Sequence, residues 1–184
     1  MKNIELMRFL VLFFLFVTSA YGQQHCGYDF TSHIVIDVHE NGKTVNIQNL
    51  KITIVDSLGN AVINENNRYS FKQNNAPLIF VENYKIEEAK SASSLAIENK
   101  APRWFYSFAK DNYILVVVNE FPIDRFQVKI EDIDKEENGG YFNTVFVPLN
   151  SSNLYVLCSD KNKASAMQFG RRLNKPVSVV LEKG

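Results

Sequence analysis

The sequence carries no excess of charge of either sign. Its 184 residues contain 20 Lys and Arg against 20 Asp and Glu, which gives a formal net charge of zero. A general nucleic-acid binder needs a basic face that neutralises phosphates, and a polybasic membrane-surface protein needs a similar excess of cations. The neutral balance therefore argues against both classes, and we expect no nucleic-acid partner.

The sequence also lacks recognisable catalytic motifs. It contains no phosphate-binding glycine loop, no Gly-x-Gly-x-x-Gly pattern and no nucleophile elbow. Internal repeats and low-complexity linkers are missing too. Hydrophobic residues make up 46% of the chain, a normal fraction for a globular protein. These features favour a non-enzymatic globular protein, with an enzyme or enzyme accessory whose site goes unrecognised as the alternative.

The longest hydrophobic run lies near the N-terminus. Two basic residues precede the apolar run Phe9–Val17, and small residues follow it at Ala20 and Gly22. This run is much shorter than the roughly 20 residues that a membrane-spanning helix needs. Charged, apolar and small-residue segments in this order are typical of a secretory signal peptide. We therefore predict a signal peptide at 1–22, and one domain at 23–184 that does not span the membrane after cleavage.

The residues after this segment argue against a lipid anchor. A bacterial lipoprotein carries small residues directly before the cysteine that is acylated, whereas Gln23, Gln24 and His25 precede Cys26. Glutamine and histidine do not fit that pattern. We expect an exported protein, periplasmic or secreted, that is not lipid-anchored.

Cysteine is scarce, with only Cys26 and Cys158 in the chain. An even number of cysteines in an exported protein favours a disulfide, and two cysteines allow a single pairing. We predict a Cys26–Cys158 bond that ties the N-terminal segment to a late strand. Two free buried thiols and a reactive thiol are the alternatives.

Alternating patterns predict β-structure through most of the chain. Residues 30–40 place apolar side chains such as Ile34 and Ile36 on one side, which is typical of a strand buried on one face. Asn41-Gly42 favours a tight turn because both residues tolerate positive φ. The pattern resumes over 44–55, so we expect a second strand there.

Further strand-sized segments follow, and Tyr113–Val118 is apolar on both faces, as in a central strand. The others are 61–63, 68–72, 77–82, 103–108, 126–131, 142–149, 154–158 and 177–181. Many short strands separated by turns predict an all-β fold with an antiparallel, Ig-like sandwich. Residues 84–102 break this rhythm, and we interpret them as an insertion, either a short helix or a loop.

Two stretches carry a family resemblance. Residues 34–43 leading into 50–60 resemble the opening hairpin of carboxypeptidase-regulatory-like, transthyretin-like sandwich domains. Residues 121–142 are similar to a late segment of exported Bacteroidetes lipoproteins, some called radical-SAM-associated, that carry such a sandwich. Lys135 replaces the glycine that usually follows Asp134 in that segment. The resemblance implies a transthyretin-like sandwich and a cell-envelope setting, and supplies no catalytic residues.

An acidic turn offers a candidate metal site. Asp132, Asp134, Glu136 and Asn138 alternate along the chain and provide the hard oxygen ligands that Ca²⁺ prefers. The glycine and glutamate positions of an EF-hand are missing. The alternative, which we favour, is a hairpin turn whose Asp and Asn side chains accept hydrogen bonds from turn amides.

An aromatic segment offers a candidate ligand face. Trp104, Tyr106 and Phe108 would share one face of a strand, where they could bind a glycan or a peptide. Ordinary core packing is the alternative, and we favour it.

The sequence as a whole predicts an exported, non-catalytic β-sandwich protein. Its expected role is interaction or scaffolding in the cell envelope, with an envelope protein or a glycan as partner. A ligand-binding module that uses the aromatic face is the second hypothesis.

Overall fold

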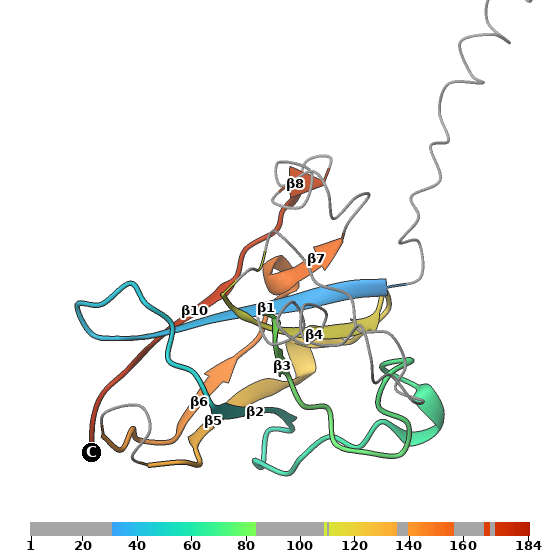
Figure 1. Cartoon of the computed structure of the whole chain (residues 1–184). Coiled ribbons are helices and arrows are strands. Elements are labelled where there is room, and N and C mark those ends of the chain that lie inside the picture. Colours follow the sequence, from blue (N-terminus) through green and yellow to red (C-terminus); the bar gives the residue numbers. More distant parts are fainter. Residues whose placement is uncertain (1–30, 84–108, 110, 136–139, 157–167, 170–171) are drawn as a thin grey trace, which may run out of the picture.

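The computed structural model describes residues 31–83, 109, 111–135, 140–156, 168–169 and 172–184, which form an all-β sandwich (Figure 1). This confirms the predicted fold class. The strands are β1 Thr31–Glu40, β2 Leu50–Val55, β3 Val81–Glu82, β4 Tyr113–Val118, β5 Gln127–Asp132, β6 Val145–Pro148, β7 Leu154–Val156, β8 Gln168–Phe169, β9 Arg172–Leu173 and β10 Val177–Leu181. Short 3₁₀ turns stand at η1 Glu65–Asn67, η3 Ile123–Arg125 and η4 Ser151–Asn153.

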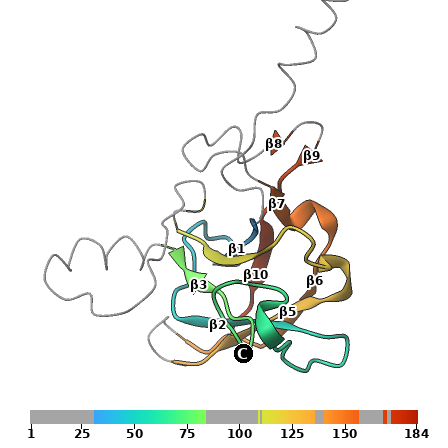
Figure 2. The same ribbon diagram turned by 90° about the vertical axis from the view of Figure 1, so that its right-hand side faces the viewer.

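Two sheets form the layers of the sandwich. One has the order β10-β1-β4-β3, with β7 also paired to β1, and the other has the order β2-β5-β6. Figure 1 shows β1 and β4 above β2, β5 and β6, and the side view in Figure 2 again places β2 and β5 below β1. Most strand pairs are antiparallel as predicted, but β1 and β10 run parallel, with Ile36 opposite Val177. Strands β8 and β9 pair with each other.

The core fills the space between the two sheets. Ile34, Ile36 and Val38 of β1 point into it, and so do Leu50 and Ile52 of β2. The alternation read from the sequence therefore identified the inward faces of both strands. None of the helices in the described residues is long and apolar enough to cross a membrane.

The prediction that β1 is buried on one face only was wrong. His33 and Val35, on the opposite face from the main core, are also buried. Val35 packs in a second cluster with Ala109, Ile114 and Tyr155. The middle of β1 is thus covered on both faces, which a period-two pattern with a histidine in it does not reveal.

The predicted second strand begins later than expected. Gly42 has a φ of 76° in the tight turn, as Asn41-Gly42 predicted. The chain then touches β1 through a single bridge between His39 and Asn46, and Asn49 adopts a left-handed φ of 58°. Beyond it β2 pairs with β5 in the other sheet. Residues 44–49 are therefore a crossover between the layers, not the first half of a strand.

A buried polar network holds this crossover in place. The hydroxyl of Tyr113 accepts a hydrogen bond from the Leu50 amide at 3.0 Å and lies 2.9 Å from the Ile47 carbonyl. The Glu82 carboxylate accepts a hydrogen bond from the Asn49 amide. Because buried amides are costly to leave unpaired, these contacts fix where the chain leaves one sheet for the other.

Segments on both sides of the sandwich link the two sheets. On one side, residues 77–80 bond to β2 through Leu78 and Phe80, and the chain continues directly into β3, which pairs with β4. On the other side, Lys183 after β10 bridges to Phe142 before β6. Linking segments of this kind limit the number of exposed strand edges.

Candidate functional site

The predicted acidic turn is built around Asp132, at the end of β5. Its two carboxylate oxygens accept hydrogen bonds from the Lys135 amide at 3.2 Å and the Phe142 amide at 3.0 Å. Lys135 has a left-handed φ of 60°. Burial raises the pKa of Asp132, but these amides outweigh burial and hold the pKa below its ordinary value. The Asp132 carboxylate thus accepts hydrogen bonds from main-chain amides, as expected if this segment is a hairpin turn.

Replacing this carboxylate by an amide is expected to destabilise the protein. Asp132→Asn removes one acceptor from a buried pair of amides, so the free energy of unfolding at pH 7 should fall by about 1–3 kcal/mol. A carboxyl with a lowered pKa stabilises the fold above its unfolded pKa, and this stabilisation is lost as the pH falls through the folded pKa. The difference in the free energy of unfolding between Asp132→Asn and wild type should therefore narrow below about pH 4.

Urea denaturation at several pH values measures this effect. Asp124→Asn is the matched control, because Asp124 is exposed on η3, and its unfolding free energy should stay within about 0.5 kcal/mol of wild type. Equal stability of Asp132→Asn and wild type at pH 7 would show that the carboxylate does not hold the turn.

Several other predicted site residues lie outside the described residues. They are Glu136 and Asn138 of the candidate Ca²⁺ site, Cys26 and Cys158 of the expected disulfide, and the aromatic residues Trp104, Tyr106 and Phe108. The signal peptide at 1–22 and the insertion at 84–102 also lie outside them. Among the described residues, no group of three or more His, Cys, Asp or Glu side chains could hold a metal ion. The Ca²⁺ site, the disulfide and the aromatic ligand face stay predictions.

A histidine of β1 lies buried on the face of the strand that does not contact the main core. His33 of β1 stands between Val116 of β4 and Tyr155 of β7, and all of its surface is buried. Burial lowers the pKa of His33 to about 3 and raises that of Tyr155 above its ordinary value. The histidine is therefore neutral at physiological pH, which suits a packing role.

Comparisons with protein-family models, with curated proteins and with solved structures found no match for this chain. The resemblance to transthyretin-like domains therefore stays a prediction.

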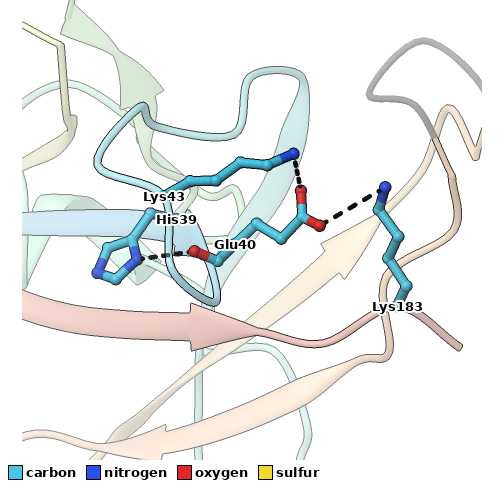
Figure 3. Close-up of polar contacts among 4 residues, drawn as sticks. All are labelled: His39, Glu40, Lys43 and Lys183. Carbon is cyan, nitrogen blue, oxygen red and sulfur yellow. Dashed lines mark hydrogen bonds and ion pairs between the residues drawn. The ribbon is translucent and has the colours of Figure 1, made fainter.

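An ion-pair cluster fastens the C-terminal segment to the end of β1 (Figure 3). The Glu40 carboxylate pairs with Lys43 of the tight turn at 2.5 Å and with Lys183 at 3.6 Å. The His39 ring lies 3.2 Å from the Glu40 carbonyl. The hydrogen bond from Lys43 lowers the pKa of Glu40 below its ordinary value, and Lys183 adds to this effect. These exposed contacts join β1, its turn and the end of β10, and we assign them a structural role.

The outer face of the β2-β5-β6 sheet presents an aromatic side chain among lysines. Phe146 of β6 stands opposite Lys129 of β5, whose Nζ lies 6.0 Å from the ring centre. Glu131 binds Lys129 at 2.6 Å and Lys51 at 3.8 Å. Two cations therefore share one carboxylate beside the ring.

The turn that follows β2 comes close to this ring and carries a second exposed apolar side chain. One oxygen of Asp56 accepts hydrogen bonds from the Leu58 and Asn60 amides, both at 2.9 Å. Gly59 has a φ of 84°, and a Cβ at Gly59 would lie 3.5 Å from the Phe146 ring. Leu58 is 84% exposed and Phe146 49% exposed. We call Leu58, Lys129 and Phe146 the outer patch.

The sequence analysis missed the outer patch because its residues come from three separate segments. The alternating pattern at 142–149 predicted a strand but not which of its side chains faces solvent. One local signal was available, since Leu58 is an apolar residue inside the polar turn 57–60. An apolar side chain that a fixed turn holds away from the core is a feature of contact surfaces.

Proposed function

We propose that this chain is an exported, non-catalytic β-sandwich protein that binds an envelope protein through the outer patch. The observation that carries the proposal is the exposure of Leu58 on a turn whose amides are held by Asp56. A fixed turn presents the leucine with little further loss of main-chain freedom on binding. The Phe146 ring, close to Gly59 of the same turn, is a second exposed apolar group.

The charges around the outer patch specify the chemistry of the partner. Lys51 and Lys129 share the single carboxylate of Glu131, and Lys129 stands beside the Phe146 ring. The Asp56 carboxylate lies in the Leu58 turn, so charges of both signs surround the apolar side chains of the patch. The proposed partner is therefore a protein surface with an apolar centre and a rim that carries both acidic and basic side chains.

Site-specific photo-crosslinking in the envelope tests this proposal. A photoreactive residue at position 58 should give a discrete crosslinked product, whereas the same residue at Ser57, exposed in the same turn, should give at least about fivefold less. The purified partner should then lose about tenfold in affinity for Leu58→Asp, because the variant puts a carboxylate where an apolar contact is required. Ser57→Asp is the matched control and should bind nearly as well as wild type.

Two results would contradict the proposal. One is equal crosslinking at positions 58 and 57, which would indicate random contact. The other is a captured protein that binds Leu58→Asp as tightly as wild type, which would place the interface elsewhere on the sandwich.

A further inference from the structure

Strand β6 lies at the outer side of its sheet. Figure 2 shows β2, β5 and β6 following one another from left to right, and β5 is the strand that pairs with β6 in the described part of the chain. The Leu149 amide donates to the Phe126 carbonyl, one step beyond the pair Gln127 and Pro148. Because hydrogen-bonded and non-hydrogen-bonded pairs alternate in an antiparallel ladder, the main-chain groups of Phe146 point away from β5. The missing N–H of Pro148 falls on the same outer edge.

The first part of this outer edge is already occupied. The Asn143 amide donates to the Glu182 carbonyl, and the Gly184 amide donates to the Tyr141 carbonyl. Asn143 and Thr144 are both exposed, so the alternation of exposed and buried side chains shifts by one residue between them, as at a β-bulge. After the shift, residues 144–148 continue the edge without a strand partner among the described residues.

This open stretch lacks the charged residues that usually protect a strand edge. Residues 140–156 contain no Lys, Arg, Asp or Glu, and Thr-Val-Phe-Val is a sequence of high β-propensity. Phe146 at its centre is half exposed. Pro148 limits the stretch at one end, but it does not remove the donor and acceptor of Phe146.

We propose that a second copy of this chain pairs with this edge, β6 against β6 in antiparallel orientation around a two-fold axis at Phe146. The two Phe146 residues would exchange both main-chain hydrogen bonds, and the Thr144 amide would donate to the partner's Pro148 carbonyl. An isologous pair of this kind needs a self-complementary surface, which an uncharged antiparallel edge provides. The two sheets then join into one that spans both copies.

The distribution of charge favours a second copy over a foreign strand. The open stretch carries no charged side chain with which to select a foreign peptide, and none that would repel its own copy. The nearest cation is Lys129 on the neighbouring strand β5. Its Nζ is paired with the Glu131 carboxylate at 2.6 Å. The chain as a whole has zero formal net charge, so long-range repulsion between copies is small.

Charge-swapped variants test the two-fold pairing. The full chain is expressed for export, purified, and examined by sedimentation equilibrium over a wide concentration range. Phe146→Lys and Phe146→Glu each place like charges across the axis, so each should lower the association constant at least about tenfold. An equimolar mixture of the two places opposite charges across the axis and should restore association. Gln127→Lys, on the same face of β5 but away from the edge, is the matched control and should associate like wild type.

The mixture keeps the test informative even if Phe146 also contributes to folding or to the outer patch. Restored association in the mixture requires both variants to be folded and to meet at position 146. A wild type that stays monomeric at millimolar concentration overturns the proposal, and so does a mixture that stays monomeric while both variants show wild-type circular dichroism. A monomeric wild type that binds unrelated extended peptides would assign the edge to a foreign strand instead. Because the readout is self-association of the pure chain, it does not depend on the envelope partner proposed above.

Discussion

Acidification from pH 7 to pH 4.5 is expected to lower the free energy of unfolding by roughly 2–3 kcal/mol through His33 alone. The folded protein keeps this histidine neutral down to about pH 3 because the ring is buried, whereas the unfolded chain takes up the proton near pH 6.5. Below pH 6.5 the unfolded state therefore binds more protons than the folded state. Stability is lost progressively as the pH falls from 6.5 towards 3.

Urea denaturation of wild type and His33→Leu across this pH range isolates the effect. The variant has no proton to take up at this position, so its stability should fall less steeply between pH 6.5 and 4.5, whatever its stability at pH 7. Parallel curves for wild type and His33→Leu would refute a neutral buried His33.

Asn64→Ala is expected to lower the free energy of unfolding by about 3–4 kcal/mol. The Asn64 side chain is fully buried and forms four hydrogen bonds to the main chain of its own loop. Its oxygen accepts from the amides of Tyr69 and Ser70, and its nitrogen donates to the carbonyls of Ser70 and Gln73. Alanine leaves all of these groups without their partner.

Two further variants separate this effect from a general sensitivity of the loop. Asn74→Ala changes an exposed asparagine of the same loop and should cost less than about 0.5 kcal/mol. Asn64→Asp keeps the acceptor but turns a carboxylate oxygen towards two carbonyls, so it should also be strongly destabilised. An Asn64→Ala protein as stable as Asn74→Ala would mean that the loop does not depend on this side chain.

Local patterns in the sequence predicted much of the fold. The alternation at 30–40 gave β1 and its core-facing side, and the doubly apolar run Tyr113–Val118 gave the central strand β4. Asn41-Gly42 gave the turn. These features depend on neighbouring residues along the chain, so a single sequence contains the information that specifies them.

The errors concern contacts between distant residues. The crossover at 44–49 depends on Tyr113 and Glu82, which lie far along the chain and hold the amides of Leu50 and Asn49. The burial of His33 depends on β7, and a histidine in an alternating strand is more often on the exposed side. The outer patch depends on the close approach of Gly59 to Phe146, which belong to segments far apart in the sequence. No local pattern records which strands become neighbours.

The parallel pairing of β1 with β10 affects the order in which the protein can fold. β1 leaves the ribosome before its partners β4, β7 and β10, and Val177 is separated from Ile36 by most of the described chain. A ribosome releases the N-terminal residues first, and contacts between residues far apart in sequence form slowly. Until β10 has been synthesised, β1 has an unpaired edge and apolar side chains on both faces. During that interval the nascent chain is most exposed to aggregation, and a chaperone that holds unfolded chains would protect it most.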